Sequence, residues 1–246
     1  MIDPGSLLIA ALFFLIALQY SSVGHAGASS YLAVMAILDV SPALMRPAAL
    51  SLNIFVAVIA AVQFYRAKCF SWALFWPFAI TSVPMAFLGG LISLQVPMYK
   101  TVVGVILLYA AARIFISAKS PAALSIKSPP RLSALLIGAG IGLLSGLTGV
   151  GGGIFLSPVL LLMGWADART TAGVAAVFIL VNSISGLDGY LLHFPSLPVQ
   201  IPLWIASVVC GGAVGSWLGS RYWGNKWLKV VLSGVLILAS IKMLFV

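Results

Sequence analysis

Apolar residues run along this chain in long blocks, and short polar segments separate the blocks. A helix needs about 20 apolar residues to cross about 30 Å of hydrocarbon, and most of the blocks have that length. We therefore expect ordinary membrane-spanning helices over six ranges: 44–65, 72–93, 99–117, 169–190, 199–219 and 226–245. Two further apolar stretches, 6–38 and 132–164, fit neither one span nor two.

Glycine and serine interrupt both exceptional stretches. The first contains SSVGHAGASS and the second SGLTGVGGG, and each lies in a run of 35 residues without a formal charge. A single helix of that length would measure about 52 Å. Two full spans would need about 40 residues and a turn. We therefore expect each stretch to form a re-entrant helical hairpin with two short limbs.

The chain also repeats itself at a spacing of 125 residues. Identical residues at this spacing include Gly24 and Gly149, Gly27 and Gly152, Tyr65 and Tyr190, Ser82 and Ser207, and Gly90 and Gly215. Their order along the chain indicates a diverged internal duplication. We expect a first repeat over 1–117 and a second over 132–246. The linker 118–131, which is rich in Ser, Pro and Lys, is predicted to be a cytoplasmic loop.

Composition supports a membrane protein and excludes several other classes. The chain is 62% hydrophobic and 7% charged, whereas a soluble domain is typically about a quarter charged. The net charge of +9 would favour nucleic acid in a soluble protein, but here the basic residues mostly separate apolar segments, so no nucleic-acid partner is expected. Cys69 and Cys210 are expected to be unpaired thiols. No metal-ligand spacing occurs, and no cofactor is predicted.

The basic residues distinguish two topologies. If 6–38 and 132–164 each crossed the membrane once, the 13 Lys and Arg residues would divide seven against six. If both stretches are hairpins, the Lys and Arg residues divide ten against three between the two sides of the membrane. The side with fewer basic residues then holds only Arg46, Lys100 and Lys242. The positive-inside rule therefore favours hairpins, with the central loop cytoplasmic and both termini outside the cytoplasmic membrane.

An inverted repeat follows from the hairpin topology. Each repeat would cross the membrane three times, so the two repeats would be upside down relative to each other. Inverted repeats with broken helices are typical of secondary transporters. The predicted fold is thus an all-α integral membrane protein made of two inverted halves, each a re-entrant hairpin followed by three transmembrane helices.

The hairpin tips form the candidate site. Irregular backbone is tolerated inside a membrane where protein buries it or where it lines a cavity. The limb after each turn begins a helix, whose free N–H groups and positive dipole end favour an anion. Two such ends would hold a small oxyanion without a buried lysine or arginine. The predicted substrate-binding residues are Gly24, His25, Gly27, Ser29, Asn53, Thr148, Gly149, Gly151, Gly152, Gly153 and Asn182.

Two ionisable residues are candidates for proton coupling. His25 titrates near neutral pH, so it could bind the anion or carry a proton. Asp188 is an acid inside a predicted span. Each candidate also has a structural alternative. The glycines could be helix-packing notches and Asn53 and Asn182 interhelical hydrogen-bonding groups; His25 could be neutral and bonded to backbone, and Asp188 could line an outer vestibule.

The glycine-rich turns GHAGASS and SGLTGVGGGIFLSPVLL are each followed by a short loop and an Ala-rich helix, RPAALSLN and RTTAGVAAVF. This pattern resembles the TauE/SafE sulfite-exporter family, also called the toluene-sulfonate uptake permease family, over essentially the whole chain. The resemblance implies ion-coupled transport of sulfite, thiosulfate, sulfonates or related anions, with the glycine turns in the transport site. The first repeat departs from the pattern at His25, Ala26 and Ala28.

Three functions compete at this stage. The leading interpretation is a secondary transporter for a small sulfur-containing oxyanion. A small-anion channel would share the site, and a non-transporting scaffold subunit is the third reading. An enzyme is not expected, because the sequence offers no nucleophile–base or metal constellation. The expected partners are a small anionic substrate and the lipid bilayer. The sequence leaves open a homo-oligomer, the particular sulfur anion and the direction of transport.

Overall fold

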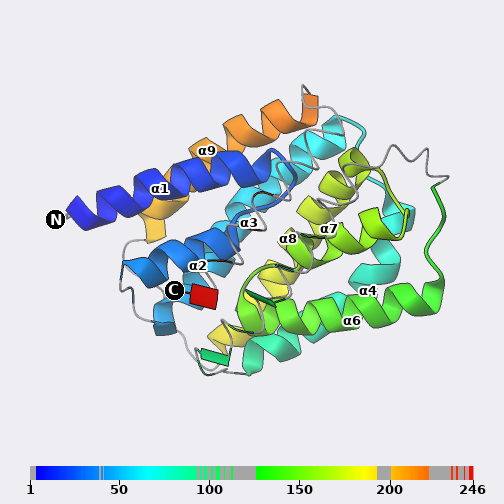
Figure 1. Ribbon diagram of the computed structural model, residues 1–246, viewed down its shortest axis with the longest axis horizontal. Helices are drawn as coiled ribbons and strands as arrows, with labels where there is room; N and C mark the ends of the chain where they lie inside the picture. The colour runs from blue at the N-terminus through cyan, green and yellow to red at the C-terminus, as the bar shows by residue number, and fades with distance from the viewer. Residues whose placement is uncertain are drawn as a thin grey trace.

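The computed structural model describes residues 4–92 apart from positions 39 and 41, residues 126–192 and 201–221, and scattered positions in 95–112 and 234–245. The described residues are helical and contain no strand. Apart from those scattered positions, the predicted spans 99–117 and 226–245 lie outside this part of the chain, as does most of the linker 118–131. The helices are α1 (Pro4–Ser21), α2 (Ala28–Ile37), α3 (Pro42–Arg66), α4 (Trp72–Leu91), α6 (Arg131–Thr148), α7 (Gly153–Leu162), α8 (Ala168–Leu191) and α9 (Ile201–Arg221) (Figure 1).

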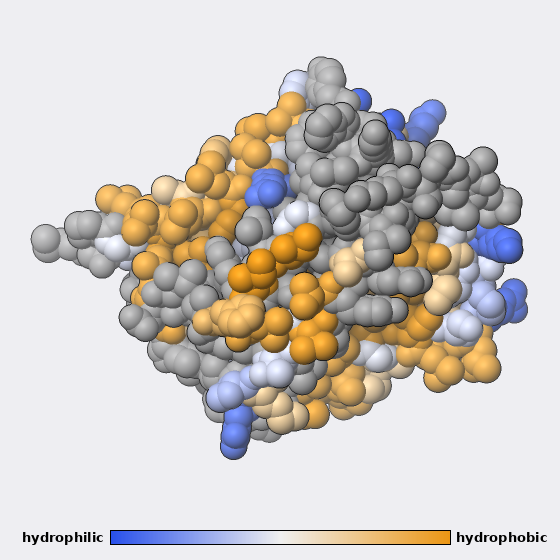
Figure 2. All heavy atoms as spheres, viewed as in Figure 1, coloured by the Kyte–Doolittle hydropathy of each residue, from blue (hydrophilic) through white to orange (hydrophobic). Residues whose placement is uncertain are grey.

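Several of these helices can cross a membrane. Among the described residues, five helices are long and apolar enough, namely α4, α6, α8, α9 and the Leu44–Arg66 part of α3. Hydrophobic residues cover most of the coloured surface in Figure 2, and most of the strongly hydrophilic ones lie at its right-hand end. The predicted class, an all-α integral membrane protein, is confirmed. The division into halves 1–117 and 132–246 stays a prediction.

Local chemistry fixes where the helices begin and end. Ser71 caps α4 by accepting a hydrogen bond from the Leu74 amide at 3.4 Å, and Asp167 caps α8 by accepting one from the Thr170 amide at 2.7 Å. Helix α6 ends at Gly149, a left-handed residue whose amide donates to the Ser145 carbonyl at 2.8 Å. Hydropathy therefore places the helices in the membrane, while polar caps and glycine set their ends.

Each long uncharged stretch forms two helices of unequal length. The first limbs, α1 and α6, have 18 residues each, whereas the second limbs, α2 and α7, have ten each. At 1.5 Å per residue, the limbs measure about 27 Å and about 15 Å. The first limbs are therefore longer than the short limbs that the sequence led us to expect. The physical reason is that the turns lie past the middle of each stretch.

Two glycine ladders hold the first limbs in place. Gly138, Gly142 and Gly146 of α6 lie directly against the backbone of Phe78, Ser82 and Ala86 of α4. In the same way, Gly211, Gly215 and Gly219 of α9 lie against the backbone of Phe14 and Leu18 of α1 and of Ser22 just after it. The numbers rise together in both ladders, so α4 runs parallel to α6 and α1 runs parallel to α9 (Figure 1). Small residues permit this close approach of helix backbones.

The centre of the bundle is the pair α3 and α8, which run antiparallel. Asn53 lies opposite Ser183, and Leu50 lies opposite Gly186. Helix α4 runs parallel to α8 and α9 parallel to α3; both pairs are in contact. It follows that α1, α3 and α9 point one way and α4, α6 and α8 point the other way.

Candidate functional site

The two glycine turns, residues 22–27 and 149–152, have left-handed glycines at two matching positions but differ between them, where Gly151 has φ of 82° and its counterpart Ala26 has no positive φ. Gly24 and Gly149 both have φ of 77°, and Gly27 and Gly152 have φ of 98° and 81°. Members of each pair are 125 residues apart. Positive φ is uncommon for residues with a side chain, so glycine at these four positions has a conformational reason. Both turns are buried.

Each second limb begins at the last glycine of its turn. The amides of Ser30 and Tyr31 donate to the Gly27 carbonyl at 3.0 Å. Those of Phe155 and Leu156 donate to the Gly152 carbonyl at 3.0 and 3.1 Å. The amides before these have no acceptor within an α-helix, and the dipole makes that end positive. The protein therefore presents two buried helix N-termini, one from each hairpin.

His25 joins the first turn to the second hairpin. Its Nδ1 lies 3.1 Å from the Val23 carbonyl oxygen, and its Nε2 lies 3.2 Å from Ser157 Oγ in α7. A carbonyl can only accept, so Nδ1 carries the proton of a neutral ring and Nε2 accepts from the serine hydroxyl. Ser157 Oγ also lies 2.9 Å from the Gly153 carbonyl. In a protonated ring, Nε2–H would donate to Ser157, whose hydroxyl would then donate to Gly153. The surroundings can satisfy both protonation states.

A polar cluster surrounds the second turn. Asn53 Nδ2, near the middle of α3, donates to the Val150 carbonyl at 3.3 Å and to Ser183 Oγ at 3.4 Å. A Cβ added to Gly151 would lie 2.8 Å from Asn53 Nδ2. Within the described part of the chain, Asn53 Oδ1 and Ser145 Oγ are buried without a hydrogen-bond partner. Since buried polar atoms are nearly always paired, these two are candidates for contact with a ligand or water.

The remaining predicted residues lie in different settings. Ser29 shares the Tyr20 hydroxyl with Ser30, at 3.1 and 2.8 Å. Thr148 Oγ1 donates to the Leu144 carbonyl of its own helix at 2.5 Å. Asn182 accepts from Ser82 Oγ of α4 at 2.5 Å and donates to the Phe178 carbonyl within α8, so both of these hydrogen bonds go to residues outside the two turns. Asp188 is exposed on α8.

Sequence reasoning missed two arginines beside the site. Arg46 contacts Gly149 and donates to the carbonyls of Gly89, Gly90 and Ile92 at 2.7, 3.1 and 2.7 Å, and also to that of Gly146. These carbonyls lie at the C-terminal ends of α4 and α6, where a cation is favourable. The charge pattern alone predicts for Arg46 only a place on one side of the membrane.

Arg169 has a corresponding role near the start of α8. It donates to the Ser220 carbonyl at the end of α9. Each arginine lies near the start of a long helix, α3 or α8, and each bonds the C-terminal end of the next long helix in sequence, α4 or α9. The signal was present in the sequence, because RPAALSLN and RTTAGVAAVF both begin with the arginine.

No three His, Cys, Asp or Glu side chains gather in a metal-binding arrangement within the described residues. The groups described around the two turns are backbone amides, hydroxyls, the Asn53 carboxamide and the His25 imidazole, with the Arg46 side chain against Gly149. Such groups bind an anion by hydrogen bonds and dipoles. Broken helices that meet inside a membrane bundle are the arrangement of secondary transporters, and the class defined by this fold is that of a membrane transporter.

Comparison with known proteins agrees with this class. The family model described as sulfite exporter TauE/SafE matches residues 9–243. The chain belongs to the TauE/SafE sulfite exporter family. It is also similar to the probable membrane transporter protein y4hK of Sinorhizobium fredii, with 42% identity over 246 residues that cover 99% of this chain and 100% of the relative. No solved structure matches the chain.

Proposed function

We propose that this transporter moves a small sulfur-containing oxyanion, such as sulfite, thiosulfate or a short sulfonate, across the cytoplasmic membrane by a proton-coupled secondary mechanism. The anion lies between the N-termini of α2 and α7. The observation that carries this proposal is the direct contact of His25 in the first turn with Ser157 in α7, which brings the two breaks together.

The chemistry around the breaks suits an oxyanion. The first amides of α2 and α7, together with the hydroxyl of Ser145, can donate to anion oxygens. Asn53 Nδ2 already donates to the Val150 carbonyl and to Ser183 Oγ, so it positions the second turn, and its unpaired Oδ1 can accept from water or from a protonated oxyanion. The guanidinium of Arg46 already donates to backbone carbonyls. An anion held mainly by dipoles and neutral donors avoids a fixed ion pair and can leave again, as a transport cycle requires.

Helix directions support the inverted repeat. On the 125-residue spacing, α1 corresponds to α6, α3 to α8 and α4 to α9. The packing described above makes the two members of every pair run in opposite directions. Because α1 and α3 point the same way, the chain between them has to return, which supports a hairpin rather than a single crossing.

The basic residues support the same topology. Arg66 and Arg221 line one groove, and Arg169 bonds Ser220 at the end of α9. These three arginines thus lie at one end of the molecule. The hairpin topology places them together, whereas single crossings would separate Arg66 from the other two. By the positive-inside rule this end is cytoplasmic.

Transport in liposomes tests the proposal. We expect purified protein to accumulate sulfite, thiosulfate or a short sulfonate when a pH gradient is imposed, and protein-free liposomes to show no such uptake. If none of these anions gives flux above the empty liposomes, the proposed function is wrong. Unitary single-channel conductance without pH-driven accumulation would favour the small-anion channel.

Variants at His25 test proton coupling in the same assay. His25→Gln keeps two polar atoms but removes the titratable ring, so we expect exchange at equal pH to persist and pH-driven accumulation to be lost. Ser157→Ala removes the hydroxyl that faces His25 and should weaken accumulation. Ser216→Ala is the control, because that buried hydroxyl bonds only within α9. Unchanged accumulation in His25→Gln would exclude His25 as the coupling group.

A further inference from the structure

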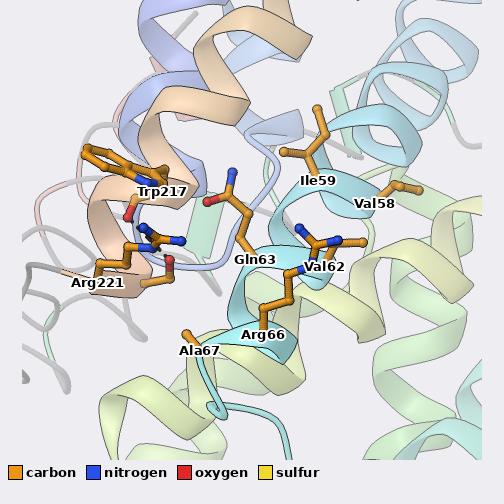
Figure 3. Close-up of a pocket in the computed structure, with 9 residues that line it drawn as sticks. Val58, Ile59, Val62, Gln63, Arg66, Ala67, Trp217 and Arg221 are labelled. Atoms are coloured by element: carbon orange, nitrogen blue, oxygen red, sulfur yellow. Dashed lines mark hydrogen bonds between the residues drawn. The ribbon is translucent and has the colours of Figure 1, made fainter.

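A groove of about 500 Å³ lies between α3 and α9, apart from the two glycine turns (Figure 3). None of its lining residues belongs to either turn. The two helices run side by side here, and Gln63 Nε2 of α3 donates to the Ala213 carbonyl of α9 at 3.0 Å. The groove is therefore a feature of the outer part of the bundle, where two parallel spans meet.

The groove has a charged end and an apolar end. Arg66 and Arg221, the last residues of α3 and α9, flank it from the two helices (Figure 3). Its lining includes no acidic residue. Arg221 lies over the Trp217 ring, 5.7 Å from the centroid, an arrangement that orients the guanidinium. In a membrane both arginines would lie at the level of the lipid headgroups.

The remaining wall of the groove is mostly apolar, apart from Gln63 and Ser220, and part of it faces outward. Val58, Val62 and Trp217 are 43%, 44% and 41% exposed, although they lie within helices that can span the bilayer. Exposed apolar side chains at that depth contact lipid chains rather than water. The groove thus has an anion-binding end at the membrane surface and continues from there as an apolar groove that faces lipid.

This combination specifies the chemistry of the occupant. A small inorganic oxyanion would use the arginines but not the apolar wall, and a neutral lipid would use the wall but not the arginines. Arginine binds phosphate through paired N–H donors, and tryptophan is favoured at the bilayer interface. An amphiphile with a phosphate head and an acyl chain uses all of these groups.

We propose that the α3–α9 groove is a binding site for an anionic phospholipid. Arg66 and Arg221 hold the phosphate, and one acyl chain lies against Val58, Val62 and Trp217. The site is independent of the proposed transport function. A lipid bound here would bridge the two halves at their cytoplasmic end and so stabilise the pair α3 and α9 by binding only the folded protein.

Lipid binding is measured on the detergent-solubilised protein by native mass spectrometry and thermal unfolding. We expect dioleoyl phosphatidylglycerol to bind and to raise the unfolding temperature, whereas dioleoyl phosphatidylcholine, with the same chains, does not. Replacing both groove arginines, Arg66→Gln with Arg221→Gln, should weaken phosphatidylglycerol binding roughly thirtyfold. An equal temperature shift with soluble glycerol 3-phosphate would overturn the proposal, because a lipid site needs the acyl chain.

Two further variants distinguish specific binding in the groove from nonspecific attraction of the lipid to a positively charged surface. Lys68→Gln with Arg131→Gln removes the same charge from exposed residues outside the groove and should weaken binding far less. Equal weakening by both pairs would overturn the proposal. Val62→Trp fills the apolar part of the groove and leaves both arginines in place, so it should reduce phosphatidylglycerol binding. This variant tests the site independently if the double variant Arg66→Gln with Arg221→Gln folds poorly. Unchanged binding in Val62→Trp would also overturn it.

Discussion

Two glycines with the same backbone angle have different neighbours. Gly24 and Gly149 both have φ of 77°. A Cβ on Gly24 would collide with the carbonyl of Ala172 in α8, whereas a Cβ on Gly149 would lie 3.0 Å from Cγ of Arg46, a side-chain atom that has to shift by only a few tenths of an ångström. The backbone angle explains why both are glycine, but only at Gly24 does packing against fixed backbone add a second reason.

This difference predicts unequal costs for the same substitution. Gly149→Ala should lower the free energy of unfolding by about 1–2 kcal/mol, the cost of a left-handed alanine. Gly24→Ala should lower it further, because the Ala172 backbone cannot move aside as a side chain can. Denaturant unfolding of the purified variants measures both values. Equal losses, or a larger loss for Gly149→Ala, would contradict the described packing.

Part of the site could be predicted residue by residue. The turn glycines were found because glycine recurs at a spacing of 125 residues and because glycine has a recognisable backbone role. The partner of His25 could not be found, since Ser157 lies 132 positions away and only packing brings it near. The capping role of Arg46 was missed for the same reason: its acceptors belong to two other helices.

At the scale of helices, the packing of α4 on α6 depends on every fourth residue. Gly142 of α6 lies against the backbone of Ser82, and Gly186 of α8 lies nearby against Gly146. Gly140 also belongs to α6, but a Cβ added to it would have no neighbouring atom within 4 Å. The hydropathy pattern predicted apolar spans but not which of their faces would meet, because that choice depends on small residues facing a distant segment.

Two substitutions on α6 test this packing. Gly142→Leu should cost at least about 3 kcal/mol of unfolding free energy, since a large side chain would have to separate two backbones in contact. Gly140→Leu should change stability little, because its side chain would point into open space toward lipid. Thermal unfolding of the two purified variants compares them directly, and similar melting temperatures would show that α4 and α6 do not approach as closely as described.

At the scale of the whole molecule, segment length and charge together predict a topology. The ten-to-three division of basic residues favours hairpins, and the arginines at the ends of α3 and α9, which that topology places on one side, line one groove. The groove itself could not be predicted. It depends on α3 lying beside α9, and their contact residues are about 150 positions apart in the sequence.

Thiol labelling in intact cells tests the orientation. In a background with serine at positions 69 and 210, Lys68→Cys and Lys127→Cys should resist a membrane-impermeant maleimide until the membrane is opened. Leu192→Cys, 68% exposed just after α8, should react at once. Labelling of all three positions from outside, or of Lys68→Cys alone, would contradict the inverted arrangement with a cytoplasmic central loop.

The parallel ladder between α1 and α9 has a consequence for how the chain is made. Residues of α1 leave the ribosome 197 residues before the residues of α9 against which their backbone packs. At about 5–20 residues per second, the first hairpin waits roughly 10–40 s for its partner. The segment synthesised earliest is thus among the last to reach its native neighbours, and during that interval the insertion machinery or lipid has to shelter the buried serines and histidine of its turn.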